Sequence, residues 1–526
     1  YPLFSVMQVS ITDGAGQLNL SGFWEMLGSG YCRDTFWFTV WQAGVSTVLT
    51  LVLAIPAAFV FTRYSFAGKS LLLAFATVPF VLPTVVVATA FDALLGERGI
   101  VNSILRATLQ LDVAPVQLER TLTLVLIAHV FYNFAVALRI IVGFWSNQSP
   151  RLEEAAKTMG ISGWQMWRRV RLPLLRPAIL AAGVLVFIFT FTSFGIVLIL
   201  GGPRFSTLEV EVYRQTISMF NLPVAAALSI VQIGFMFVMM LVYTRLQQRI
   251  ALPIQGRFVV ESPPRTRRER ASVWATVIGM SLLLFAPLLA LVFRAFTTSG
   301  GIDNFLRLGT NPRGSVLFVP PLIAVGNSVV FAVATTVLAV SLGILTSILI
   351  ESRRVRGLDA LFMLPLATSA VTLGLGYLIG MGGPPLNLRS SALLVPLAHT
   401  LVALPFVIRS VLPALRMIPR NLIDAARVLG ESPRGVWRRV LLPIVGRATA
   451  VGATFAFTVS MGEFGASLFI ARPDTPTMPV VIFRLLGQPG ASNYGQALAM
   501  SVILMMVCAI AFISIERLRM GAVGEF

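Results

Sequence analysis

A twenty-residue segment, EAAKTMGISGWQMWRRVRLP at residues 154–173, occurs a second time as DAARVLGESPRGVWRRVLLP at residues 424–443. The two copies lie 270 residues apart, and the same spacing relates His129 to His399. A single register kept over so many positions indicates duplicated architecture. We therefore expect two halves of one design, each carrying one copy of the segment.

An apolar composition places both halves in a membrane. Of the 526 residues, 56% are hydrophobic and only 12% are charged. Apolar runs of about 20 residues recur along the chain, and each is long enough to cross the bilayer as a helix. The sequence predicts an all-α polytopic membrane protein. The expected spans are 36–62, 70–95, 120–144, 178–200 and 223–246, then 272–295, 322–350, 358–382, 391–414, 447–470 and 494–515.

The net charge of +19 is compatible with nucleic-acid binding, but the placement of the charges indicates membrane topology instead. Lys and Arg follow the first, third and fifth spans of the first half, and the second half repeats this alternation. Cationic loops of membrane proteins stay in the cytoplasm. The matched segments and both termini are therefore expected on the cytoplasmic side of a bacterial inner membrane, with no nucleic-acid partner.

The two halves are expected to run parallel, because both copies of the segment fall on one side of the membrane. Residues 1–246 form the first predicted half, 247–270 a Pro- and Arg-rich cytoplasmic linker, and 271–526 the second half. The opening Tyr-Pro-Leu-Phe resembles Ala-Pro-Leu-Leu at 286–289, inside the first span of the second half. We expect six helices in each half, the first of them only partly present.

Each copy of the segment has the features of a compact docking helix. Small Ala155 and Ala156 allow close approach of a partner. Glu154 sits early in the helix, where negative charge is favourable, and Gly160 lets the chain turn. At the same spacing, the second copy supplies Asp424, Ala425, Ala426 and Gly430.

Both copies resemble the EAA motif of the permease subunits of binding-protein-dependent ATP-binding-cassette (ABC) importers, although Asp424 stands where that family usually has Glu. The resemblance implies the type I ABC importer transmembrane fold. It also implies two copies of a separate ATPase subunit, docked at 154–160 and 424–430, and an extracytoplasmic solute-binding protein. An ordinary amphipathic connector is the alternative interpretation of one copy, but two copies at one spacing favour docking.

ATP chemistry is not expected in this chain. A phosphate-binding loop needs Gly, four residues, then Gly-Lys-Ser or Gly-Lys-Thr. The segment Gly68-Lys69-Ser70 comes near, but Arg63 stands where the first Gly is needed. We therefore expect no enzyme and no bound cofactor, with ATP and Mg on the partner ATPase.

Polar side chains within spans are candidates for the translocation pathway, because they are costly to place in a membrane. Glu463 and Phe464 correspond by spacing to Ser193 and Phe194, so the acid occurs in one half only. These four residues are the candidate pathway residues. Glu463 is predicted either to line the pathway or contact a cationic solute, or to be a gate hinge or a hydrogen-bonded packing acid.

The two histidines of the chain, His129 and His399, lie at matched positions within spans. Symmetric placement favours hydrogen bonding between helices over metal binding, which needs more ligands nearby. No metal site is predicted.

The outer segment of the first half gives an indication of the substrate. The outer segment Leu200-Gly201-Gly202-Pro203, followed by Thr207-Leu208-Glu209 and Tyr213, is similar to the thiamine and ferric-iron permease subfamily, and is nearer the thiamine type. A proton-coupled secondary transporter of the major-facilitator type also has two parallel six-span halves and is the alternative. The EAA spacing has no reason to occur there, and intramembrane acid and base pairs are nearly absent.

Overall fold

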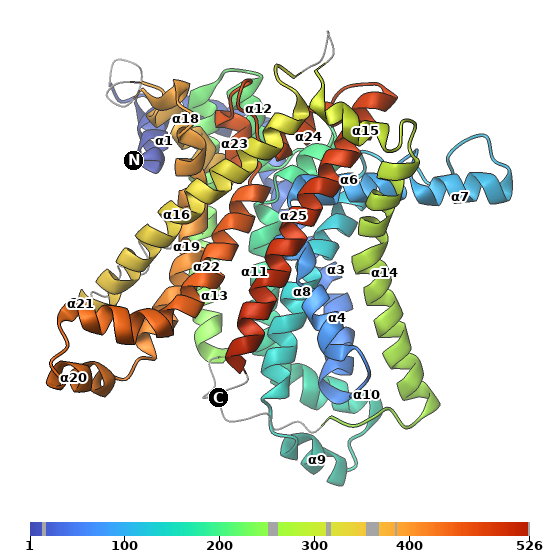
Figure 1. Cartoon of the computed structure of the whole chain (residues 1–526). Coiled ribbons are helices and arrows are strands. Elements are labelled where there is room, and N and C mark those ends of the chain that lie inside the picture. Colours follow the sequence, from blue (N-terminus) through green and yellow to red (C-terminus); the bar gives the residue numbers. More distant parts are fainter. Residues whose placement is uncertain (13–16, 251–260, 312–316, 354–367, 384–386, 524–526) are drawn as a thin grey trace.

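The computed structural model describes residues 1–12, 17–250, 261–311, 317–353, 368–383 and 387–523, and they form an all-helical protein (Figure 1). Nine helices in these ranges are long and apolar enough to cross a membrane. The helical polytopic class predicted from composition is therefore confirmed.

Four long helices build the first half: α3 (Gly30–Arg63), α8 (Leu122–Ser146), α11 (Leu172–Phe191) and α13 (Leu222–Ile250). Helices α3, α8 and α11 pack on one another, and α11 also packs on α13. Alanines such as Ala58, Ala135 and Ala182 are fully buried in one apolar cluster of this bundle. Small side chains let membrane helices approach closely.

Shorter helices complete this half. They are α1 (Pro2–Ile11), α2 (Ser21–Gly28), α4 (Lys69–Phe75), α5 (Val78–Val81), α6 (Thr84–Leu95), α7 (Ile100–Leu109), α9 (Arg151–Thr158), α10 (Gly163–Met166), η1 (Trp167–Arg171), η2 (Val197–Gly201) and α12 (Leu208–Ile217). The expectation of one continuous span over 70–95 is wrong, because α4, α5 and α6 divide it. Pro79 lies in the first turn of α5 and Pro83 precedes α6, and a proline lacks the N–H that would continue a preceding helix.

The second half has the long helices α14 (Arg267–Thr297), α16 (Pro321–Arg353), α19 (Leu394–Arg416), α22 (Leu442–Gly462) and α25 (Ala491–Val523). Its short elements are α15 (Asp303–Leu306), η3 (Arg307–Gly309), α18 (Ala370–Gly380), η4 (Leu388–Ser390), α20 (Arg420–Val428), α21 (Pro433–Val436), η5 (Trp437–Leu441), α23 (Gly465–Ile470) and α24 (Met478–Leu486). Part of the expected span 358–382 lies outside the described residues.

Helix α14 begins within the predicted linker rather than after it. Thr266 and Glu269 form a capping box, in which each side chain bonds the other's backbone N–H. The helix therefore starts at Arg267, four residues before the predicted start of the second half. Residues 251–260 of the linker lie outside the described residues.

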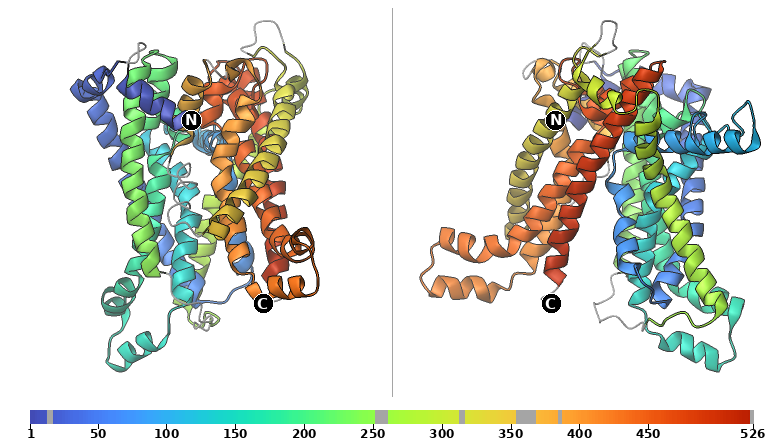
Figure 2. Two further views of the ribbon diagram at one scale, coloured as in Figure 1. Left: turned by 90° about the vertical axis from the view of Figure 1, so that its left-hand side faces the viewer. Right: turned by 45° about the vertical axis from the view of Figure 1, so that its right-hand side comes forward.

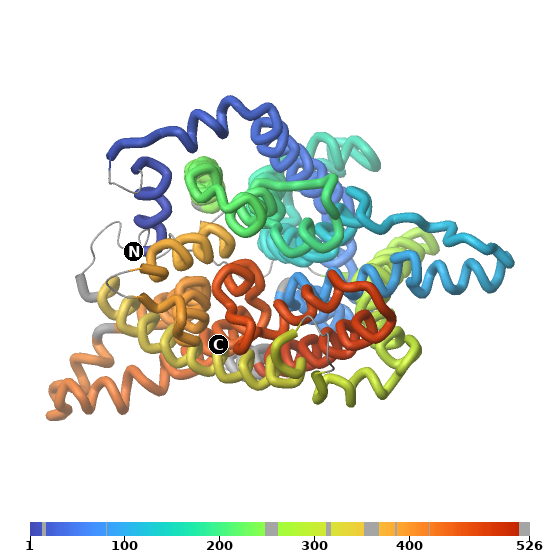
Figure 3. Tube along the Cα trace, turned by 90° about the horizontal axis from the view of Figure 1, so that it is seen from above, coloured from blue at the N-terminus to red at the C-terminus, as the bar shows by residue number. Residues whose placement is uncertain are grey.

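Two helices cross between the halves in matching ways. Helix α1 packs against α13 and α18, and α14 packs against α25 and α6 (Figure 3). The approach of α1 to α18 depends on Gly376, because an added Cβ would lie 2.6 Å from the Pro2 carbonyl oxygen. The halves are thus held together by helices that each pack on the other half.

The matched loops project from one end of the molecule. Helices α9 and α20 lie at this end, whereas α12 and α24 lie at the other (Figure 1). The two groups of long helices diverge toward the end that carries α9 and α20 (Figure 2). Tyr1 lies toward the opposite end, and the carboxyl-terminal part of α25 lies toward the matched loops.

Two expected spans are interrupted by breaks. The spans predicted at 178–200 and 447–470 begin earlier, as α11 and α22, and these helices end at Phe191 and Gly462. New helices then form, η2 in the first half and α23 in the second. Ser193 and Phe194 lie in the first break, and Glu463 and Phe464 lie in the second.

Candidate functional site

The matched loops are residues 151–171 in the first half and 420–441 in the second. In each of them a glycine turn ends the short helix. Gly160 has φ 81°, its N–H donates to the Lys157 carbonyl at 2.9 Å, and the Ile161 N–H donates to the Ala156 carbonyl at 3.0 Å. This is a Schellman motif, in which a left-handed glycine satisfies the last carbonyls of a helix. The second loop repeats it at Gly430, φ 84°, with bonds to Arg427 and from Glu431 to Ala426. The turn predicted from Gly160 is confirmed.

Both loops expose apolar side chains. In the first loop Leu152 is 54% exposed and Met159 79%. The second loop exposes Leu422, Val428 and Leu429. Glu154, Ala155, Asp424 and Ala425 are also exposed, whereas Ala156 and Ala426 are buried. Apolar side chains gathered on a projecting helix are typical of a surface that meets another protein.

Ion pairs of Glu153 hold the first loop together and join it to its bundle. Arg63 Nη1, at the end of α3, lies 3.5 Å from Glu153 Oε2, and Arg171, at the end of the loop, makes a closer pair. Glu153 accepts hydrogen bonds from Arg171 Nε at 3.1 Å and from Nη2 at 3.0 Å. The guanidinium also lies over the rings of Phe59, at 4.8 Å, and Trp167, at 5.3 Å. A two-pronged pair backed by aromatic faces is rigid and directional.

The second loop has an apolar anchor at the same two positions. Ile423 and Leu441 stand where the first loop has Glu153 and Arg171. Both pack against a buried cluster that includes Val407. The two loops therefore share one backbone design but are fastened by different forces.

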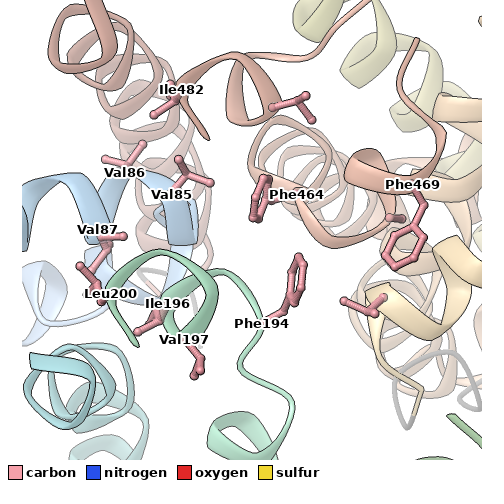
Figure 4. Packing of buried hydrophobic residues seen from close by; sticks show 14 of the residues in the cluster. Val85, Val86, Val87, Phe194, Ile196, Val197, Leu200, Phe464, Phe469 and Ile482 are labelled. Atoms are coloured by element: carbon pink, nitrogen blue, oxygen red, sulfur yellow. The ribbon is translucent and has the colours of Figure 1, made fainter. Parts of the chain in front are cut away.

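The helix breaks bring the candidate pathway residues of both halves together. The rings of Phe194 and Phe464 stack with centroids 5.6 Å apart and planes 28° apart (Figure 4). Tyr213 packs on Phe194 at 5.7 Å, and Phe483, which corresponds to Tyr213 by spacing, packs on Phe464 at 5.4 Å. Four rings thus form a row across the junction of the halves.

Each histidine bridges helices beside this row, as the sequence predicted. His129 Nε2 lies 2.8 Å from Ser193 Oγ, and Nδ1 lies 3.2 Å from Ser46 Oγ. His399 contacts Ser460 Oγ and Ser467 Oγ, both at 2.8 Å. The interhelical role expected for the histidines is therefore confirmed. Among the described residues, no group of three or more His, Cys, Asp or Glu is placed to hold a metal ion.

Glu463 is 6% exposed and caps the helix that follows it. Its two carboxylate oxygens accept the N–H groups of Ala466 and Ser467, each at 2.9 Å. His399 Nε2 lies 3.3 Å from the same carboxylate. This geometry favours the hydrogen-bonded packing acid of the two roles predicted for Glu463.

A cavity of about 360 Å³ lies at the breaks and is lined by both halves. All four candidate pathway residues, Ser193, Phe194, Glu463 and Phe464, line it. Glu209 lines it as well, although the sequence offered this residue only as part of a resemblance. The signal available in the sequence was an asymmetry between the halves, because Glu209 corresponds to Pro479 at the spacing of 270.

Comparison with known proteins identifies the family. Residues 50–252 match the family described as "Binding-protein-dependent transport system inner membrane component". The chain is also 26% identical over 513 residues to the Thiamine transport system permease protein ThiP of Salmonella typhimurium, covering 95% of this chain and 91% of that protein. The chain belongs to the binding-protein-dependent ABC permeases.

Other similar proteins agree with this assignment. ThiP of Escherichia coli is 26% identical over 498 residues, covering 91% of this chain and 88% of that protein. A Probable ABC transporter permease protein, y4fN of Sinorhizobium fredii, is 25% identical and covers 100% of this chain and 94% of its own length. A crystal structure of a bacterial ABC transporter involved in the import of the acidic polysaccharide alginate is 18% identical over 48% of this chain and 90% of that chain, with TM-score 0.40. That score is too low to support an argument.

Membership of this family decides several expectations. The chain is a multi-pass inner-membrane permease subunit of an ABC importer, and such subunits are neither enzymes nor cofactor-binding proteins. A binding-protein-dependent system includes an ATPase and a solute-binding protein. The major-facilitator alternative is therefore wrong.

The different anchors of the two permease loops lead to a swap experiment. Glu153→Ile with Arg171→Leu gives the first loop the residues of the second, and we expect uptake within about twofold of the unaltered protein. Arg171→Ala alone removes the bidentate partner of the partly buried Glu153 carboxylate and leaves Arg63 Nη1, at 3.5 Å, as its cationic neighbour. The loss should cost roughly 1–3 kcal/mol of loop stability. ATP-dependent uptake in proteoliposomes and ATPase copurification are the measurements. A double variant as impaired as Arg171→Ala would contradict interchangeable anchors.

Proposed function

We propose that the chain is the translocation subunit of an ATP-driven thiamine importer. The observation that carries the proposal is the similarity, over 95% of the chain, to permeases named for thiamine transport. The sequence expectation also included ferric iron, but none of the relatives described above is named for iron. Thiamine is therefore the substrate proposed.

The proposed architecture has two parallel six-helix halves, residues 1–246 and 271–526, joined by 247–270. Support comes from the matched loops at one end and from the matched packing of α1 on α18 and α14 on α6. The loops, the linker and the carboxyl terminus are proposed to lie in the cytoplasm, in keeping with the cationic loops. The cytoplasmic position expected for the amino terminus does not fit Tyr1, which lies toward the opposite end of the molecule.

Two copies of an ATPase are proposed to dock beneath the membrane, one at each loop. The first proposed docking surface exposes Glu154, Ala155 and Gly160, with Ala156 buried beneath them. The second exposes Asp424, Ala425 and Gly430, with Ala426 buried beneath them. When ATP draws the ATPases together, the loops transmit the motion to α11 and α22, because each loop continues through η1 or η5 into that helix. The pathway then changes between two populated states.

The proposed gate is the row of rings centred on Phe194 and Phe464. Phe464 directly precedes α23, which lies at the end of the molecule opposite the matched loops (Figure 1), so the stacking of Phe194 on Phe464 corresponds to a pathway closed toward the outside. Opening requires the two halves to separate where these rings stack.

The docking surfaces can be tested with Gly160→Asp and Gly430→Asp together. Each glycine faces open space, so the new carboxylates would project into the proposed ATPase contact. We expect normal membrane insertion, at least about tenfold weaker ATPase binding and no uptake. Gly163→Asp is the matched control, because Gly163 also has positive φ and faces open space in the same loop. Unaltered ATPase coupling in the double variant would refute the docking assignment.

The gate can be tested with Phe194→Ala and Phe464→Ala together. Removing both rings opens the contact between the halves, so solute should leak without ATP and basal ATPase activity should rise several-fold. Phe187→Ala is the control, since Phe187 stacks on Phe191 within one bundle, at 5.9 Å. Leak and ATPase rates in proteoliposomes are the readout, and an unchanged double variant would refute the gate.

The substrate can be tested by reconstituting the permease with its ATPase and solute-binding protein in liposomes. We expect ATP-dependent accumulation of radiolabelled thiamine, and no accumulation of ferric iron. Competition by excess unlabelled thiamine is the control for specificity. ATP-driven uptake of another solute, with none of thiamine, would overturn the proposal.

A further inference from the structure

The cavity between the halves has an unusual charge for this protein. The chain carries 41 Lys and Arg against 22 Asp and Glu. Yet the described residues that line the cavity include the carboxylates of Glu209 and Glu463 and neither a Lys nor an Arg. The described lining therefore holds two acidic side chains and no Lys or Arg, within a strongly cationic chain.

Glu209 is buried without a cation to balance it. It is 1% exposed and accepts a hydrogen bond from Gln232 Nε2 at 2.7 Å. The hydroxyl of Ser369, from the other half, also hydrogen-bonds with it. No ion pair to Glu209 occurs in the described part of the chain. A buried carboxylate is costly unless a positive charge lies nearby.

Glu211, in the same helix, is a buried acid that does have a cationic partner. Glu211 is fully buried too, but Arg214 donates to both of its oxygens at 2.9 Å. It does not line the cavity. Helix α12 therefore carries two buried acids. Glu211 is paired with Arg214, whereas Glu209 faces the cavity and has no cationic partner among the described residues.

Glu463 differs from Glu209 in how it is held. Its oxygens accept the backbone N–H groups that it caps, and His399 Nε2 lies 3.3 Å away, so the carboxylate is held in a fixed position. Among the described residues, Glu209 has only an amide and a hydroxyl as partners, and both can be exchanged for a ligand without leaving a buried charge unpaired. Glu209 is thus the acid better placed to meet a ligand.

Aromatic side chains complete the lining. Phe194, Phe464, Tyr132 and Phe406 come from both halves. Ring faces attract cations, and they also stack with flat ligands. The volume of about 360 Å³ falls at the lower end of the range for small-molecule sites, roughly 300–1,000 Å³.

We propose that this cavity is a substrate site for an aromatic organic monocation, with Glu209 as its counter-charge. The assignment deepens the proposed function and rests on it, because thiamine is such a cation through its thiazolium ring. The permease then selects for charge at a site of its own, in addition to any selection by the solute-binding protein.

The test compares thiamine with its thiophene analogue, in which carbon replaces the charged thiazolium nitrogen. The intact purified permease should bind thiamine at least about tenfold more tightly, as measured by calorimetry without the solute-binding protein. Glu209→Gln should reduce this preference to about threefold or less. Glu211→Gln is the matched control and should keep the preference, because Glu211 lies outside the cavity.

The outcomes separate the site from the substrate. Equal binding of the two compounds by the unaltered permease would overturn the site without any variant, so a misfolded Glu209→Gln protein does not block the test. A well-folded Glu209→Gln variant that keeps the preference would also overturn it. If N-benzylpyridinium binds in a Glu209-dependent way while thiamine neither binds nor is transported, the cation site stands and the thiamine proposal fails.

Discussion

Backbone breaks inside a membrane protein are the constraint on which this structure depends. An interrupted helix leaves N–H and C=O groups unpaired, and lipid cannot satisfy them. The break after α22 is repaired by Glu463, whose carboxylate caps α23, and the histidines tie both breaks to neighbouring helices. Such repairs must be enclosed by protein, so both breaks face the junction of the halves. The stacked rings and the cavity lie there for the same reason.

The two halves share a backbone plan but differ in chemistry. Crossing helices, glycine turns and aromatic rows recur in both. The buried acids do not recur. At the spacing of 270, Glu463 corresponds to Ser193 and Glu209 corresponds to Pro479. Each half thus contributes one carboxylate to the cavity, from a different element. A fused chain permits this, because its halves can diverge independently.

The sequence predicted the features that depend on local pattern. Long apolar runs, cationic loops and the spacing of 270 indicated the helices, the repeat and the glycine turns. The broken span at 70–95 was missed, because a run of apolar residues hides the effect of Pro79 and Pro83. The partners of Glu209 and the pair of Glu153 with Arg171 were missed as well. Such contacts join residues that are distant in the sequence or adjacent only after folding, so spacing alone does not reveal them.

The different anchors of the two matched loops have a consequence for the conditions under which coupling holds. Dissolved salt weakens the attraction between Glu153 and Arg171, although less than that of an exposed pair because both side chains are mostly buried, and it leaves apolar contacts intact. Cooling weakens the burial of Ile423 and Leu441 but affects an ion pair far less. Of these two anchors, ionic strength therefore acts mainly on the ion pair of the first loop, and low temperature acts mainly on the apolar contacts of the second loop. Because the two anchors differ, either change of conditions leaves one loop attached to its helices.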